Sequence, residues 1–192
     1  MVIKIKTKDL VLAALFAALT AVGAFIRVPI PYVPFTLQVL FVFFAGSLLG
    51  SRLALISQLV YLGIGLIGIP IFTHGGGPSY ILQPTFGYLI GFAIGAYVIG
   101  KIIENLRDKT FINFLLANLS GLAVVYLFGV VYLYFNLNYI AATAISLSKA
   151  IKIGFLLPIS GDLLLCIIAA LISKNVISQV REALPVMSIE NR

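Results

Sequence analysis

Residues 111–135 read FINFLLANLSGLAVVYLFGVVYLYF and contain no Lys, Arg, Asp or Glu. A helix needs about 20 mostly apolar residues to cross the hydrocarbon core of a bilayer, and this run is long enough. The whole chain has the same character, because 61% of its 192 residues are hydrophobic and only 10% are charged. Soluble domains are roughly 45–50% apolar, with about a quarter of their residues charged. The sequence therefore predicts an all-α integral membrane protein.

Charged residues, prolines and glycines divide the rest of the chain into similar apolar runs. They predict one membrane domain, 1–192, built as a bundle of about six transmembrane helices. The expected helices cover residues 10–28, 35–49, 53–69, 85–103, 111–135 and 158–180. Pro29, Pro31 and Pro34 end the first helix and favour an extended loop.

The distribution of Lys and Arg predicts the orientation of the bundle. With the N-terminus inside, the cytoplasmic segments hold Lys4, Lys6, Lys8, Arg52, Lys101, Arg107, Lys109, Lys174, Arg181 and Arg192. The outer segments hold Arg27, Lys149 and Lys152. Because cytoplasmic loops are enriched in basic residues, both termini are expected in the cytoplasm of a multi-pass protein of a prokaryotic cell membrane. The scattered cations indicate topology and not a nucleic-acid partner.

Enzyme chemistry is not expected. The chain has one His and one Cys, which is too few for a zinc hydrolase motif or a CxxC site. Gly63 to Gly68 match GxGxxG, but the motif lies within an apolar run with no strand before it. We therefore expect no cofactor, no metal and no catalytic residue.

Asp162 is the acidic residue that most needs an explanation. It lies about one turn inside the last expected helix, where a charge costs roughly 2.5–3.5 kcal/mol near the middle of the bilayer. Such a group normally faces the bundle interior, which predicts a ligand contact. The alternative is a carboxylate at a helix N-terminus, stabilised by about 0.3–1 kcal/mol.

The outer cations and one loop complete the candidate site. Lys149 and Lys152 lie three residues apart and, like Arg27, could attract a ligand carboxylate. Arg27 could instead extend along the membrane surface.

The loop from Pro70 to Pro84 is rich in Gly and aromatic residues and has no Lys or Arg. We expect it to be a lid that uses Phe72, His74 and Tyr80, the alternative being an ordinary connector.

Small residues form two stripes at helical spacing, which allow close approach of helices. Gly87, Gly91 and Gly95 form one stripe. Ala13, Ala17 and Ala21 form the other. Packing within the bundle explains either stripe, and docking of a partner membrane protein is the second interpretation of the alanines.

Several stretches together resemble the BioY family, the biotin-specific substrate-binding (S) components of energy-coupling factor transporters. They are Val33-Pro34-Phe35-Thr36-Leu37-Gln38, residues 45–53, Tyr61-Leu62-Gly63 with Gly65, residues 68–72, residues 83–92, Tyr126-Leu127-Phe128-Gly129, and residues 157–164 with Ser160-Gly161-Asp162. They occur in order over nearly the whole chain.

The resemblance implies a protein that captures biotin or a biotin-like vitamin acid from outside for ATP-driven uptake. It also implies a transmembrane coupling protein and two ATPase subunits as partners, with the alanine stripe docking on the coupling protein. Asp162 is expected to accept ring N–H groups of biotin. Thr85, Tyr88, Gln83 and Asn118 would add hydrogen bonds. The family tends to have a lysine three residues after the aspartate, where this chain has Leu165, and lipoate is the alternative ligand on the same scaffold.

A different class of function is a stand-alone transporter driven by an ion gradient. Such a protein needs coupling groups near the membrane midplane and usually has internal repeats. The sequence shows one carboxylate within an apolar run and no convincing repeat, so the binding subunit is the favoured hypothesis.

Overall fold

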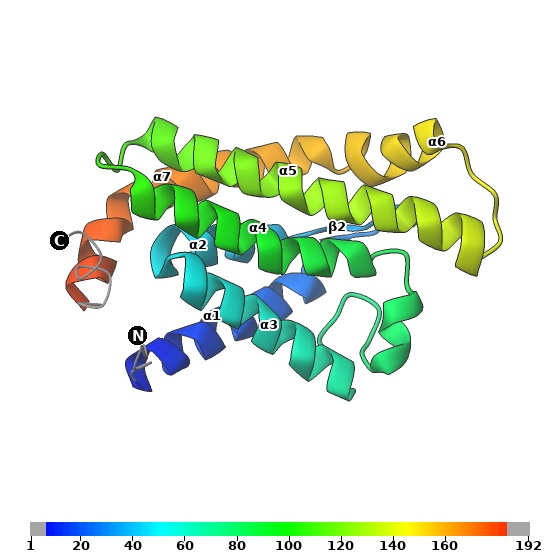
Figure 1. Ribbon diagram of the computed structural model, residues 1–192, viewed down its shortest axis with the longest axis horizontal. Helices are drawn as coiled ribbons and strands as arrows, with labels where there is room; N and C mark the ends of the chain where they lie inside the picture. The colour runs from blue at the N-terminus through cyan, green and yellow to red at the C-terminus, as the bar shows by residue number, and fades with distance from the viewer. Residues whose placement is uncertain (1–6, 184–192) are drawn as a thin grey trace.

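The computed structural model describes residues 7–183 and shows an all-α bundle (Figure 1). Its main helices are α1 (Thr7–Phe25), α2 (Gln38–Leu49), α3 (Ser51–Ile67), α4 (Phe86–Asn105), α5 (Phe111–Phe135) and α7 (Ile159–Ala183). Shorter elements are the strands β1 (Arg27–Val28) and β2 (Phe35–Thr36), the 3₁₀ turn η1 (Pro78–Leu82), the helix α6 (Leu147–Ile151) and the π-helical turns η2 (Asn136–Ile140) and η3 (Lys152–Leu156). The prediction of an all-α bundle of about six helices is confirmed.

Four helical segments are long and apolar enough to cross a membrane. They are Thr7–Phe25, Phe86–Asn105, Phe111–Ile140 and Leu147–Gln179. The helices α2 and α3 are shorter, at 12 and 17 residues, and meet at Gly50. Leucine, isoleucine, valine and phenylalanine side chains cover the outside of the bundle, as expected of a surface that contacts lipid.

A small antiparallel hairpin lies between α1 and α2 and shortens both helices. The expected first helix, 10–28, corresponds to α1, which ends at Phe25, and residues 27–28 form β1 instead. The expected second helix, 35–49, corresponds to α2, which begins at Gln38, because Phe35–Thr36 pair with β1 as β2. Pro29 prevents α1 from continuing, and the chain satisfies its backbone groups by strand pairing. α2 is only about 18 Å long at 1.5 Å per residue, and the hairpin strand β2 directly precedes it in the chain.

Glycines hold α4 and α5 at very short distance. A Cβ atom at Gly91 would lie 2.8 Å from the Cα of Val125, and one at Gly95 would lie 2.9 Å from the carbonyl oxygen of Gly121. On α5, a Cβ at Gly129 would overlap the ring of Tyr88. The glycine stripe of α4 therefore packs against α5 within the bundle, because glycines allow two helix backbones to approach closely.

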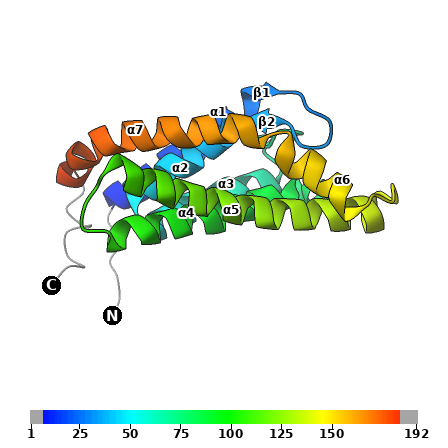
Figure 2. The ribbon, with the colours of Figure 1, turned by 90° about the horizontal axis from the view of Figure 1, so that it is seen from above.

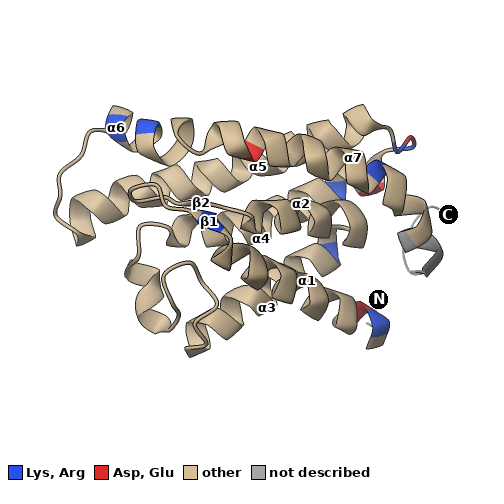
Figure 3. Cartoon of the chain, turned by 180° about the vertical axis from the view of Figure 1, so that it is seen from behind, with Lys and Arg blue, Asp and Glu red and all other residues tan. Residues whose placement is uncertain are grey.

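The start of α1 and the end of α7 lie at the same end of the bundle, and α7 runs beside α2 and α5 (Figures 1 and 2). Most charged residues of the described part gather at this end (Figure 3). The opposite end holds fewer charges, among them Lys149 and Lys152 on the segment from α6 to η3.

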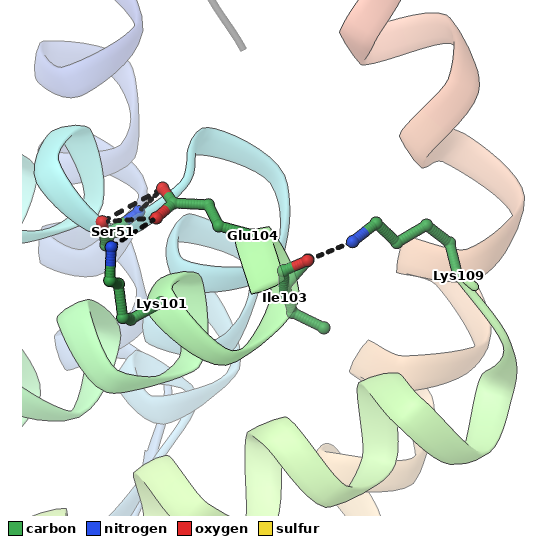
Figure 4. Close-up of polar contacts among 5 residues, drawn as sticks. All are labelled: Ser51, Lys101, Ile103, Glu104 and Lys109. Carbon is green, nitrogen blue, oxygen red and sulfur yellow. Dashed lines mark hydrogen bonds and ion pairs between the residues drawn. The ribbon is translucent and has the colours of Figure 1, made fainter. Parts of the chain in front are cut away.

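A carboxylate joins α4 to the start of α3 at the charged end. Glu104 accepts hydrogen bonds from the backbone amide of Ser51 at 2.6 Å and from its hydroxyl at 2.8 and 3.0 Å (Figure 4). Lys101 lies 4.0 Å from the same carboxylate. Lys109 donates to the carbonyls of Ile103 and Leu106 and closes the C-terminus of α4 (Figure 4). The carboxylate thus acts as a cap for α3 supplied by another helix.

We expect Glu104→Gln to lower the stability of the bundle by about 1–2 kcal/mol, because a charged acceptor of an N-terminal amide is replaced by a neutral one. Cys166 is the single cysteine and is fully buried, so a thiol-reactive dye reports unfolding on heating. The exposed carboxylate Asp108 in the next loop provides the control Asp108→Asn, which should leave the melting temperature unchanged. Equal melting temperatures for Glu104→Gln and wild type would contradict this role of the cap.

Candidate functional site: a cavity with one carboxylate

A cavity of about 50 Å³ lies beside the β1–β2 hairpin and the loop before α4. It is lined by Val33, Pro34, Phe35, Thr36, Gln38, Val39, Thr73, Tyr80, Thr85, Tyr88, Leu89, Phe92, Val125, Tyr126, Pro158 and Asp162. These residues come from the hairpin, α2, the loop before α4, α4, α5 and the start of α7. The space holds only a few water molecules, so a larger ligand requires an outward movement of the hairpin or the loop.

Asp162 is the one lining residue with a charged side chain. It lies in the first turn of α7, and its Oδ2 accepts a hydrogen bond of 2.5 Å from the hydroxyl of Tyr126 on α5. The ring of Tyr126 contacts Phe155 and Tyr88 edge to face, with centroid distances of 4.9 and 6.2 Å. The predicted inward orientation of Asp162 is therefore seen, and Tyr126 is a partner that the sequence reasoning did not single out.

Two predicted residues of α4 and its N-terminus also line the cavity. Thr85 lies within 3.3 Å of the Tyr80 hydroxyl, a pair in which either oxygen can donate. Tyr88 donates its hydroxyl proton to the carbonyl of Gly154 at 2.7 Å. Burial raises the pKa of Tyr80, so its hydroxyl stays protonated and available as a donor.

The wall formed by the hairpin and α2 contributes two polar side chains, Thr36 and Gln38, among apolar ones. Gln38 is buried, donates to the Tyr61 hydroxyl at 2.6 Å and accepts from Thr36 and Thr73 at 3.2 and 3.1 Å. The Tyr61 hydroxyl in turn donates to the carbonyl of Ile71. Sequence reasoning missed Gln38 and Thr36 as lining residues. The available signal was a glutamine at the start of an apolar run, since a polar group there must find partners inside the bundle.

The loop from Pro70 to Pro84 covers one side of the cavity. Phe72 is almost fully buried, with its ring 5.3 Å from that of Tyr61 and 4.5 Å from that of Tyr80. Tyr80 lines the cavity directly, and His74 is exposed. The loop thus has a buried aromatic anchor and an exposed tip.

Arg27 connects the hairpin to this loop. Its guanidinium donates to the carbonyl of Thr73, a lining residue, although Arg27 itself does not line the cavity. Partial burial and the neighbouring Arg27 lower the pKa of His74 from its ordinary value.

The other predicted ligand contacts lie away from the cavity. Gln83 is exposed after η1. Lys149 and Lys152 are exposed on α6 and η3. Asn118 is fully buried between α2, α5 and α7, where it accepts from Ser47 at 3.0 Å and donates to the carbonyl of Cys166 at 3.4 Å. Its hydrogen bonds hold three helices together below the cavity.

The alanine stripe of α1 faces the bundle. Ala13 and Ala17 are buried, and Ala21 is half-buried, where α1 packs on α2 and α3. The stripe is therefore occupied by packing within the chain and is not open to a partner. Ala14 and Ala18, one position further along, are the exposed alanines of α1.

Fold and cavity together define a multi-pass membrane protein with a mainly apolar pocket that contains one carboxylate. The family model described as BioY family matches residues 1–182. The probable biotin transporter BioY of Lysinibacillus sphaericus is 51% identical over 177 residues, which are 92% of this chain and 90% of that protein. The biotin transporter BioY of Thermotoga maritima is 37% identical, over 86% of this chain and 94% of that protein.

A solved structure has the same fold. The crystal structure of the S-component for biotin from an ECF-type ABC transporter superposes with a TM-score of 0.81 and 28% identity, covering 93% of this chain and 95% of that one. The chain belongs to the BioY family. These relatives are transport proteins, in agreement with the prediction that the chain is not an enzyme.

We expect Gly65→Ala to loosen the loop over the cavity. A Cβ at Gly65 would overlap the Phe72 ring, which has no free space between Tyr61 and Tyr80. A Cβ added at Gly63 on the same helix would have no atom within 4 Å, so Gly63→Ala is the matched control and should stabilise α3 by up to about 1 kcal/mol. Amide hydrogen exchange of residues 70–77 should rise in the first variant only, and equal exchange in both would show that Phe72 is not the anchor.

The lowered pKa of His74 predicts that acid loosens the same loop. A histidine with a lowered pKa in the folded state contributes stability above its unfolded pKa of about 6.5, and loses it as the pH falls below that value. The protection factors of the amides in residues 70–77, which remove the intrinsic pH dependence of amide exchange, should therefore be lower at pH 5.5 than at pH 7.5. The variant His74→Gln should remove most of this difference, and an unchanged difference in that variant would assign the effect to another group.

Proposed function

We propose that this chain is the substrate-binding S component of an energy-coupling factor transporter and that it captures biotin from outside the cell. The observation that supports this most directly is Asp162, a carboxylate inside a cavity whose other lining residues are uncharged. Membership of the BioY family and the likeness to the biotin S-component structure support the same assignment.

Asp162 is the proposed acceptor for the ring N–H groups of the ligand. Its Oδ2 is bound by Tyr126, which leaves Oδ1 as a hydrogen-bond acceptor. A carboxylate enclosed by a ligand strongly favours ligands that supply N–H donors, because an unmatched acceptor loses its hydration without compensation. Thr85 and Tyr88 add polar groups on the α4 wall, and Phe35 and Phe92 provide apolar surface for the ring and tail.

Arg27 is the proposed partner of the ligand carboxylate. Of the three outer cations, it is the one that contacts a lining residue, through the Thr73 carbonyl. Lys149 and Lys152 lie on α6 and η3, away from the lining. The ligand would then lie with its ring toward Asp162 and its carboxylate toward the lid.

The partner subunits are proposed from the family membership and from the distribution of charge on the bundle. Most of the described charges gather at the end that holds the start of α1 and the end of α7, which fits a cytoplasmic location of that end in a prokaryotic cell membrane. A transmembrane coupling protein and two ATPases would supply the ATP hydrolysis. Because Ala13 and Ala17 are buried, the proposed contact with the coupling protein uses the exposed face of α1 that contains Ala14 and Ala18.

We expect Asp162→Asn to weaken biotin binding by at least 100-fold, since the amide is a weaker acceptor and brings its own N–H groups to the ligand donors. Isothermal titration of the purified protein with biotin measures this. The exposed Ser160 on the same helix gives the control Ser160→Ala, which should bind as the wild type does.

Titration with lipoate separates the alternative ligand. Lipoate carries a dithiolane ring without N–H groups, so tight lipoate binding that survives Asp162→Asn would replace biotin as the ligand. Biotin binding that is unaffected by Asp162→Asn would remove Asp162 from the site.

A further inference from the structure

Pro158 leaves one helix carbonyl without its usual donor. In an α-helix the amide of residue 158 would donate to the carbonyl of Gly154, but proline has no N–H. The backbone before Pro158 forms the π-helical turn η3, in which the amide of Leu157 donates to the carbonyl of Lys152 at 3.1 Å. The α-helical pattern resumes where the backbone amide of Asp162 donates to the carbonyl of Pro158 at 3.2 Å.

Tyr88 supplies the missing donor from α4. Its hydroxyl proton is directed at the Gly154 carbonyl at 2.7 Å, and a Cβ at Gly154 would lie 2.7 Å from the same hydroxyl oxygen. Glycine at this position therefore gives the hydroxyl room to reach the carbonyl. A tyrosine hydroxyl has one proton, so the Tyr88 oxygen can only accept hydrogen bonds from the cavity.

The hydroxyl of Tyr126 also donates its proton to a protein acceptor. Its proton is directed at Asp162 Oδ2, and its ring is held by Tyr88 and Phe155. A carboxylate that receives this proton offers its remaining lone pairs as acceptors. Three oxygen-bearing side chains on one side of the cavity, from α4, α5 and α7, thus have acceptor capacity and no uncommitted donor.

We infer that Tyr88 and Tyr126 determine ligand specificity by giving their protons to Gly154 and Asp162, so that this side of the cavity accepts hydrogen bonds only. The ligand class it selects has a head group with two adjacent N–H donors, such as a cyclic urea. A ring without donors, such as a dithiolane, leaves these acceptors unmatched. This inference rests on the proposed function, because it assumes that the cavity is the ligand site.

The size of the selectivity follows from the cost of unmatched polar groups. A site built to hydrogen-bond a ligand group rejects an analogue without it by about 10⁴-fold or more in favourable cases. We expect the wild-type chain to prefer biotin by at least 100-fold over biotin methylated at one ring nitrogen, and over lipoate.

The test compares these ligands in variants by isothermal titration. Tyr126→Phe removes one acceptor oxygen and the hydrogen bond that positions Asp162, so the preference for biotin over the methylated analogue should fall below about tenfold. A purely steric rejection of the methyl group would leave that preference unchanged in Tyr126→Phe, and this result would overturn the inference.

Tyr88 needs a variant that separates folding from specificity. Tyr88→Phe leaves the Gly154 carbonyl unpaired and should lower the melting temperature. Pro158→Ala in the same chain restores an amide that can donate to Gly154, so Tyr88→Phe/Pro158→Ala should regain stability. It should still show a reduced preference for biotin, because the acceptor oxygen is gone.

The outcomes distinguish a failure of the inference about Tyr88 and Tyr126 from a failure of the proposed function. A double variant that regains both stability and the full preference for biotin would show that Tyr88 is only structural and would overturn the inference, while the proposed function stands. A wild-type chain that binds no biotin would overturn both.

Discussion

The close approach of α4 and α5 is the contact on which the cavity depends. Glycines on both helices remove the side chains that would separate them, and Gly91 and Gly129 lie directly against the backbone of Val125 and the ring of Tyr88. In a bilayer there is no hydrophobic force to bring two apolar helices together, so close van der Waals packing of this kind carries the association. It also places Tyr88 and Tyr126 on adjacent walls, with their rings 6.2 Å apart.

Polar groups inside the bundle obey a second constraint, because the hydrocarbon core offers no water to satisfy them. Asn118, which does not line the cavity, pairs with Ser47 and the Cys166 carbonyl. Around the cavity, the hydroxyls of Tyr88 and Tyr126 donate to protein acceptors, which fixes the direction in which their protons point. The pairing that keeps the fold stable is thus the same pairing that decides which hydrogen bonds a ligand can make.

The irregular backbone is concentrated around the cavity. The β1–β2 hairpin, the loop before α4 and the π-helical turn η3 all lie at the end where the lining residues gather. Non-helical backbone is tolerated in a membrane protein where it lines a cavity and its groups are paired. The hairpin and the loop are joined by Arg27 and Thr73, so a ligand that displaces one of them must also act on the other.

Sequence alone determined the membrane bundle and its approximate helix positions, and it singled out Asp162 as the charge that needs a place inside the bundle. These follow from length, hydropathy and the cost of an isolated charge, which are local properties of a chain in a bilayer. Only the tertiary structure showed that residues 27–36 form a hairpin, that Gln38 and Tyr126 line the cavity, and that Asn118, Lys149 and Lys152 do not. It also showed that Ala13 and Ala17 face inward. The direction of a side chain and the partner of its proton depend on which helices meet. Those contacts join residues far apart in the chain, such as Tyr88 and Gly154, so the local sequence does not specify them.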